Sequence, residues 1–425
     1  MLESVKAQWR VLVDYPNFRR LFGGTSVSLL GSSVTTVALP LTAVLLLGAS
    51  PVQMGLLGAA SFLPHLALGL PAGVWVDRLS YRRVIVGADL LAAAALATVP
   101  LLAATGLLRM WQLYLVVLVT GACELFSAIA AQSFAPVLLP RRELLAANSA
   151  FALSNSVVAT SGNALGGVLV QLFTAPVAIA VDAVSFLLSA LSKARITITG
   201  RSTGAEPPKE SIFKGIWGGL RAAVEHPVLR TTTIAATVGA LAGQMQAVIV
   251  VLFLVHNLSL SSGLVGLVIA VSGISGIAGA TIGVPVTGRL GTGPTFILGM
   301  TLSSLAGLVM AAAAGPMTLV LAVLIVAQLL RGWGPTLYGI NQVTIRQVLI
   351  APELLARTQA TWRFLVHGMK PIGALLGGTL GALLGLRATL VISSLIMLTG
   401  TTVALLSPLR TLRRLPEAET DHAVE

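Results

Sequence analysis

The residues with the clearest chemical potential are four ionisable side chains that lie deep inside long apolar stretches of the chain. They are Glu124, Arg331, Lys370 and His65. A charge at the centre of a bilayer costs about 2.5 to 3.5 kcal/mol on insertion scales, so such residues mark proton, ion or substrate pathways. A carboxylate at that depth can bind and release a proton, and a cation can attract an anionic group. Which of them act together depends on the helices that hold them.

The chain is too apolar to be a soluble globular protein. Of its 425 residues, 56% are apolar and 10% are charged, and the mean hydropathy is +0.92, whereas about 25% of residues are charged in soluble proteins. The apolar residues form twelve runs, each long enough to cross about 30 Å of hydrocarbon as a helix. We predict an all-α integral membrane protein with transmembrane helices over 18–47, 52–76, 84–105, 111–139, 146–170, 174–193, 228–257, 261–287, 295–314, 317–349, 358–384 and 387–406.

The placement of positive charge predicts the orientation in the membrane. When alternate loops are assigned to opposite sides, 21 of the 27 lysines and arginines lie on the side of the N-terminus. Loops rich in Lys and Arg stay in the cytoplasm, so we expect both termini to be cytoplasmic. The net charge of +12 is therefore a signal of topology, and we expect the lipid bilayer, not nucleic acid, to be the partner of this chain.

The two halves of the chain repeat each other. The segment 15–19, Tyr-Pro-Asn-Phe-Arg, recurs as His-Pro-Val-Leu-Arg at 226–230, and Gly166-Gly167 recurs at the same offset of 211 residues as Gly377-Gly378. We predict two pseudo-symmetric six-helix halves, 1–193 and 226–425 with its short cytoplasmic tail, joined by a cytoplasmic linker over 194–225. Parallel repeats of this kind place the substrate site between the halves near the membrane midplane.

Residue depth selects the candidates for coupling and substrate binding. Glu124 and Arg331 lie about 20 Å into matching helices of the two halves, near the midplane. Lys370 precedes Pro371, where a kinked helix would free a carbonyl for its ammonium group. His65 is as consistent with packing as with proton transfer. Uncharged groups at similar depths complete the set: Asn155, Gln244, Gln246 and Gln328.

Two further acids have less certain positions. Asp89 lies near the cytoplasmic end of the third predicted helix and is expected to support the neighbouring loop, and Asp182 is expected to pack within the sixth. Transport chemistry is the alternative for both residues.

The loop 73–83 carries a recognisable pattern. The segment lies between the second and third predicted helices and follows the pattern G-x-x-x-D-R-x-G-R-[RK]. Ser80 replaces the second glycine of the pattern and Tyr81 its first basic residue, and the segment contains Gly73, Asp77, Arg78, Arg82 and Arg83. The sequence thus resembles the major facilitator superfamily. The resemblance implies that this loop controls the conformational switch on the cytoplasmic side, and that helices 1, 4, 7 and 10 line the central cavity. Glu124 and Arg331 would then face each other across the cavity, and a buried structural ion pair is the alternative.

Further strings narrow the resemblance to one branch. Leu144 to Ser149, Val181 to Phe186, and Arg346-Gln347 with Pro352 and Arg357 are similar to the branch that contains macrolide exporters and the enterobactin exporter. This resemblance implies a drug:proton antiporter of the bacterial inner membrane, which exports a hydrophobic or amphipathic small molecule by alternating access. An uptake symporter or a uniporter is one alternative. A lipid scramblase or membrane scaffold that transports nothing is another.

An enzymatic role is not expected. The chain has no G-K-[ST] phosphate-binding motif, and its single G-x-S-x-G match lies in the polar central segment, at 200–204, without the strand and helix that the motif requires. The one cysteine, Cys123, cannot form a cysteine metal site. We expect no cofactor and no metal, a monomeric protein, and a small molecule and protons as partners.

Overall fold

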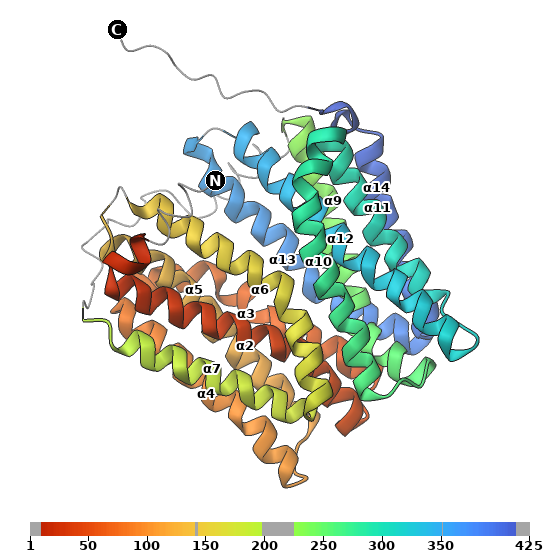
Figure 1. Cartoon of the computed structure of the whole chain (residues 1–425), viewed down its shortest axis with the longest axis horizontal. Helices are drawn as coiled ribbons and strands as arrows, with labels where there is room; N and C mark the ends of the chain where they lie inside the picture. Colours follow the sequence, from red (N-terminus) through yellow and green to blue (C-terminus); the bar gives the residue numbers. More distant parts are fainter. Residues whose placement is uncertain (1–9, 141–142, 198–224, 351, 414–425) are drawn as a thin grey trace. The chain divides into compact units, whose positions relative to one another are not determined.

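The computed structural model describes residues 10–140, 143–197, 225–350 and 352–413 and is built from helices. The first six long helices are α2 (Pro16–Leu47), α3 (Pro51–Asp77), α4 (Tyr81–Ala104), α5 (Met110–Leu138), α6 (Leu144–Leu172) and α7 (Ala175–Ala194) (Figure 1). The next six are α9 (Pro227–Leu252), α10 (Ser262–Leu290), α11 (Thr292–Ala311), α12 (Met317–Leu349), α13 (Pro352–Leu383) and α14 (Leu386–Leu405). A π-helical turn, η2 (Phe253–Asn257), extends α9, and a 3₁₀ turn, η3 (Pro408–Thr411), follows α14.

These helices confirm the predicted fold class. Each of the twelve predicted spans falls on one long helix in the described residues, and ten of the helices are long and apolar enough to cross a membrane. The other two are α6, which is rich in Ser, Thr and Asn, and α13, which carries four charged side chains. Most of the predicted linker, residues 198–224, lies outside the described part of the chain.

By contacts, the chain divides into two compact units. The first contains the described residues up to 197 together with 247–274 and 374–386, and the second contains 225–246, 275–373 and 387–413. The units cut through α9, α10 and α13, whereas the predicted division runs through the linker. The predicted domain boundaries therefore stay a prediction.

Short connections between helices follow from local capping chemistry. The turn between α2 and α3 begins at Gly48, whose φ of 59° is the left-handed conformation that favours glycine at a helix end. Ser50 then caps α3: its hydroxyl accepts the backbone N–H of Gln53, and the Gln53 side chain accepts the N–H of Ser50 at 2.9 Å. This capping box satisfies two N–H groups at the start of α3.

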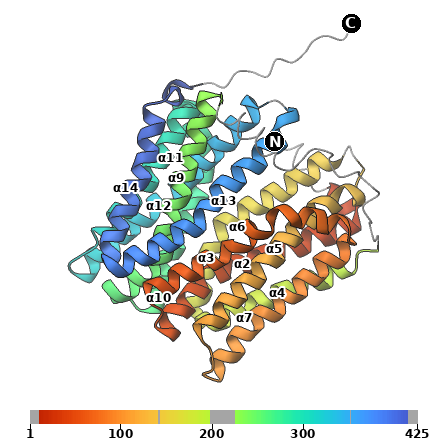
Figure 2. The same cartoon turned by 180° about the vertical axis from the view of Figure 1, so that it is seen from behind.

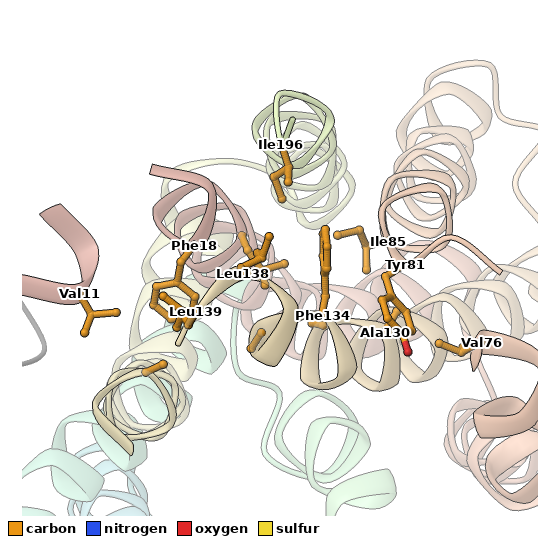
Figure 3. Packing of buried hydrophobic residues seen from close by; sticks show 14 residues of the cluster. Val11, Phe18, Val76, Tyr81, Ile85, Ala130, Phe134, Leu138, Leu139 and Ile196 are labelled. Atoms are coloured by element: carbon orange, nitrogen blue, oxygen red, sulfur yellow. The ribbon is translucent and has the colours of Figure 1, made fainter. Parts of the chain in front are cut away.

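In the first unit, a buried hydrophobic cluster lies where α2, α4 and α5 meet, with Ile196 just beyond the end of α7. Figure 3 shows Phe134 of α5 between Leu138 and Ile85, with Tyr81 of α4 to the right and Ile196 above them. Phe18 of α2 packs edge-on against Phe151 of α6 at 5.6 Å between ring centroids. Figures 1 and 2 both show α2, α4 and α7 side by side, so residues far apart in sequence meet across these three helices.

In the second unit, α11 packs along α12. Phe296 of α11 meets Tyr338 of α12 edge-on, with ring centroids 6.0 Å apart. The turn η3 returns to the start of α11, where the Gly293 N–H donates to the Leu412 carbonyl at 2.9 Å. This arrangement anchors the end of α14 to α11.

The predicted loop 73–83 is shorter than the sequence pattern suggested. Gly73 and Asp77 lie in the last turns of α3, and their side chains are outside the described part of the structure. The next helix begins at Tyr81 after Ser80 in an extended cap conformation. Only residues 78–80 connect the helices, because the basic residues Arg82 and Arg83 already belong to the first turn of α4.

Candidate functional site

Glu124 lies on an uncovered face of α5. Its side chain is exposed, as are Ala128 and Gln132 one and two turns further along the helix. The Ser32 side chain of α2 interacts with its carboxylate. Within the first unit, no described Lys, Arg or His lies within 4 Å of the Glu124 carboxylate. A carboxylate in a membrane-length helix without a cation favours binding of a proton.

Asp182 of α7 is a second acid near Glu124. Its side chain is 1% exposed. Thr35 of α2 donates a hydrogen bond to Oδ2 at 2.5 Å, and Ser185 donates one to Oδ1 at 3.1 Å. Glu124 lies within electrostatic range of Asp182. The structure therefore brings an acid from α5 and an acid from α7 to hydroxyl groups one turn apart on α2.

Asp89 does not support the loop as expected from the sequence. Its carboxylate forms a buried ion pair with Lys193 of α7, with 2.8 Å between Oδ2 and Nζ, and both side chains are 1% exposed. Ser189 donates to the same carboxylate oxygen at 2.6 Å, and Ser127 of α5 to the other at 3.4 Å. The reason is that α4 packs along α7, so Asp89 faces Lys193 and not the residues next to it in sequence.

The basic residues of the motif are split between two environments. Arg82 donates to the Ala194 carbonyl at the end of α7, and Arg20 of α2 donates to the Arg195 carbonyl. Cations at the C-terminal carbonyls of a helix are favourable because those carbonyls are unsatisfied and carry partial negative charge. Arg78 and Arg83 are exposed. Of the motif's arginines, Arg82 thus ties α4 to α7.

The second unit contributes cations. Arg331 in α12 is half-buried and makes no hydrogen bond or ion pair with another described residue of its unit. Lys370 in α13 is half-buried and precedes Pro371 within the helix, as expected. Glu124 belongs to the first unit and Arg331 to the second, so their pairing stays a prediction.

The candidate amides and His65 occupy several environments. Asn155 in α6 is exposed, Gln244 in α9 and His65 in α3 are half-buried, and Gln328 in α12 is buried. Gln246 is also buried, and its amide donates to the Ser394 hydroxyl of α14 at 3.1 Å. This contact favours a packing role for Gln246.

Acids and cations are unequally distributed along the chain. Between Glu225 and Glu353 the sequence contains no Asp or Glu. Carboxylates inside predicted spans are therefore confined to the first six helices, and Arg331 and Lys370 lie in the last six. Only the first half can bind protons on carboxylates deep in the membrane.

Sequence reasoning missed the partners of these acids. Lys193 is the last residue of the predicted sixth helix, where a basic residue is common, and nothing in the sequence distinguishes Ser32, Thr35 and Ser185, because hydroxyls are common in apolar helices. Gln132 could have been found, because its spacing of eight residues from Glu124 places both on one helix face.

The described residues form helices of membrane length that carry ionisable side chains within them. The family model and the efflux relatives show that this architecture is that of a multi-pass membrane transporter and not of an enzyme. The chain belongs to the transmembrane secretion effector family of the major facilitator superfamily, whose model matches residues 12–424. Its family relatives are bacterial, in agreement with a multi-pass protein of a bacterial membrane.

Two curated relatives carry functional names. The chain is 30% identical over 419 residues to the multidrug efflux pump Tap of Mycobacterium tuberculosis, covering 96% of this chain and 97% of the relative. It is 24% identical over 181 residues to the macrolide efflux protein A of Streptococcus pyogenes, covering 43% of this chain and 44% of the relative.

Solved structures show the same fold. The nucleoside transporter NupG superposes with a TM-score of 0.70 at 11% identity, covering 92% of this chain and 98% of that chain. A bacterial homologue of the human lysosomal transporter Spinster superposes with a TM-score of 0.69 at 16% identity, covering 94% and 98%. These likenesses confirm the major facilitator fold predicted from the sequence.

Proposed function

We propose that this protein exports a hydrophobic or amphipathic small molecule, such as a drug or natural product, in exchange for protons. The names of its relatives, a multidrug efflux pump and a macrolide efflux protein, support export of such compounds. The observation that carries the proton coupling is Glu124, an exposed carboxylate inside a membrane-length helix with no cation beside it in its own unit. Macrolides are our first candidate substrates.

Export would proceed by alternating access. Glu124 takes up a proton when it faces the outside and releases it when it faces the cytoplasm, and the substrate moves in the opposite direction. A membrane potential of 100 mV supplies about 2.3 kcal/mol for each charge moved, which corresponds to roughly 50-fold accumulation for one proton. The gradient can therefore drive export without ATP.

The proposed substrate pathway uses the remaining candidates. Arg331, Lys370, Gln244, Gln328, Asn155 and His65 offer charge and hydrogen bonds to a bound molecule, whereas Gln246 is assigned to packing. We further propose that both termini lie in the cytoplasm, because most Lys and Arg lie on that side, and that one chain transports on its own.

A panel of substrates tests export directly. Cells that lack their major efflux pumps would express the full chain and would be challenged with macrolides, other antibiotics and siderophores. We expect reduced accumulation of at least one class, and restored accumulation after addition of a protonophore. Export that persists after the protonophore would contradict proton coupling, and increased accumulation would favour uptake.

Neutralising Asp77 should slow transport without weakening binding. Asp77 and its basic neighbours lie at the junction of α3 and α4, which the family resemblance assigns to the conformational switch. We expect Asp77→Asn to reduce the export rate by about tenfold, equivalent to about 1.4 kcal/mol in the barrier, with substrate affinity nearly unchanged. Parallel binding and efflux assays provide the measurement. Loss of binding, with normal interconversion of inward and outward forms, would rule out the switching role.

The selectivity of the protein for the charge of its substrates should depend on Lys370. Because Arg331 and Lys370 lie in the last six helices, which hold no acid inside a predicted span, we expect neutral and anionic compounds to be exported besides basic macrolides such as erythromycin, whose amine is protonated at neutral pH. Lys370→Met should remove protection against anionic compounds, and Lys370→Arg should keep it. Growth-inhibition tests with matched anionic and cationic compounds provide the measurement. Protection confined to lipophilic cations, and unaffected by Lys370→Met, would contradict this preference.

A further inference from the structure

Asp182 is enclosed by hydroxyl groups where α7 contacts α2. Thr35 Oγ1 donates to its Oδ2, and the Ser185 hydroxyl lies 3.1 Å from its Oδ1 and 2.8 Å from the Asp182 backbone carbonyl oxygen, so that it can donate to either. Gly31 of α2 makes this contact possible, because a Cβ at that position would overlap the Ser185 hydroxyl and the Asp182 carboxylate. The absence of a side chain at Gly31 thus lets the carboxylate lie directly against the backbone of α2.

No described cation neutralises this carboxylate. No Lys, Arg or His lies within 4 Å of Asp182 among the described residues, and its side chain is 1% exposed. Burying an ionised carboxylate costs several kcal/mol unless a cation pairs with it, so such groups tend to take up a proton. A hydroxyl can donate to the ionised carboxylate and can also accept from the protonated acid. Thr35 and Ser185 can therefore form hydrogen bonds with Asp182 both when it is ionised and when it is protonated.

The other titratable groups around Asp182 are few. The helices packed against α7 are α2, α4 and α6. Charged residues of α2 are limited to Arg19 and Arg20 in its first turns, α6 has none, and in α4 Asp89 is already bound to Lys193. Arg82 and Arg83 lie at the distant start of α4, beside Tyr81. On α5, Glu124 and Cys123 remain, and Glu124 is within electrostatic range.

The hydroxyls of α2 connect the two acids. Ser32 interacts with Glu124, and Thr35 is bonded to Asp182. Residues three positions apart are neighbours on a helix surface, with Cβ atoms about 5 to 6 Å apart. One turn of α2 therefore carries hydroxyls from the exposed acid to the buried one.

We propose that Asp182 is a second proton-binding residue, which exchanges a proton with Glu124 through the hydroxyls of Ser32 and Thr35. In each exchange one O–H bond of the Glu124 carboxylic acid breaks and one forms on the Asp182 carboxylate. Each hydroxyl accepts one proton and passes one on, so the hydroxyls are unchanged. The inference rests on the proposed role of Glu124 in coupling. In this proposal, Asp182 holds the proton while Glu124 is ionised and exposed to the substrate.

Infrared difference spectroscopy on the full chain in lipid bilayers can count the protonated carboxyls. A change of pH should give two carboxyl bands in the unmodified protein, one lost in Asp182→Asn and the other in Glu124→Gln. The band that remains in each variant should shift, because the two acids interact. A single titrating band that only Glu124→Gln removes would overturn the role of Asp182. Absence of any titrating band would instead remove the proton role of Glu124, and with it the proposed function.

Transport in proteoliposomes can distinguish a role of Asp182 in proton transfer from a structural role in holding α2 against α7. The probe is labelled erythromycin, a macrolide. We expect Asp182→Asn to reduce uptake driven by a proton gradient by about a hundredfold, the lower end of what a positioned proton-transfer group contributes. Exchange of labelled for unlabelled erythromycin without a gradient should persist. Equal loss of both activities would show a structural role and contradict the proposal.

Thr35 provides a second test that leaves both acids in place. Thr35→Val keeps the shape of the side chain but removes the hydroxyl, whereas Thr35→Ser keeps the hydroxyl. We expect Thr35→Val to shift the Asp182 band and to slow gradient-driven uptake, and Thr35→Ser to do neither. Identical behaviour of the two variants would contradict a hydroxyl relay.

Discussion

Glu124→Gln is expected to reduce proton-driven efflux to the background of vesicles that lack the protein. Glutamine keeps the size of glutamate and one acceptor oxygen, with an NH2 donor like the O–H of the protonated acid, but it cannot gain or lose a proton near neutral pH. Glu124 is exposed on α5 and has no cation within its own unit, so its titration is available for coupling. The measurement is uptake of labelled erythromycin into proteoliposomes with an imposed pH gradient.

Two controls separate coupling from binding in this experiment. Exchange of labelled for unlabelled substrate without a gradient should survive in Glu124→Gln, because exchange requires no net proton movement. Glu124→Asp keeps a carboxyl one methylene shorter and should restore part of the gradient-driven uptake. If Glu124→Gln still concentrates the substrate when a gradient is imposed, the proton is carried elsewhere.

Breaking the ion pair between Asp89 and Lys193 should produce the largest loss of stability. Both side chains are 1% exposed, and their charged atoms are 2.8 Å apart. Removal of one partner leaves an unpaired buried charge, at a cost of about 3 to 5 kcal/mol. We expect Asp89→Asn and Lys193→Met each to lower the melting temperature of the purified protein strongly. The double variant should be more stable than the sum of the two single changes predicts.

The pair between Arg10 and Glu143 supplies the matched control. Its atoms are 3.3 Å apart, but the Arg10 side chain is 64% exposed, and exposed ion pairs contribute about 0 to 1 kcal/mol. Arg10→Gln should therefore change the melting temperature little. Strictly additive losses in the Asp89 and Lys193 variants would show that the two groups do not act as a pair.

The positions of the helices could be predicted from the sequence because membrane spans leave a direct signal. Runs of about twenty apolar residues, and the turns between them, follow from the thickness of the bilayer. The start of α3 also has a signal in the sequence, because Ser50, Pro51 and Gln53 form a capping pattern. The boundary between α3 and α4 is harder to predict from the sequence, because the basic residues there belong to a helix and not to a loop.

The partners of the buried acids could not be predicted, because they depend on which helices are neighbours. Asp89 and Lys193 are 104 residues apart, and nothing near either residue in the sequence indicates the other. Asp182 was assigned to packing for the same reason: its neighbour Thr35 lies 147 residues away. Helix depth could be estimated by counting residues, but helix adjacency required the structure.

The most direct test of proton-coupled export measures proton movement caused by the substrate itself. Proteoliposomes with the full chain would carry a pH-sensitive dye inside, with the membrane voltage held at zero by potassium and valinomycin. An inward gradient of erythromycin should then drive protons out and make the interior alkaline faster than in vesicles without protein, where passive entry of this weak base gives a slow change, and vesicles with Glu124→Gln should show only the slow change. Erythromycin entry through the protein with no alkalinisation beyond that of vesicles without protein would contradict proton-coupled export.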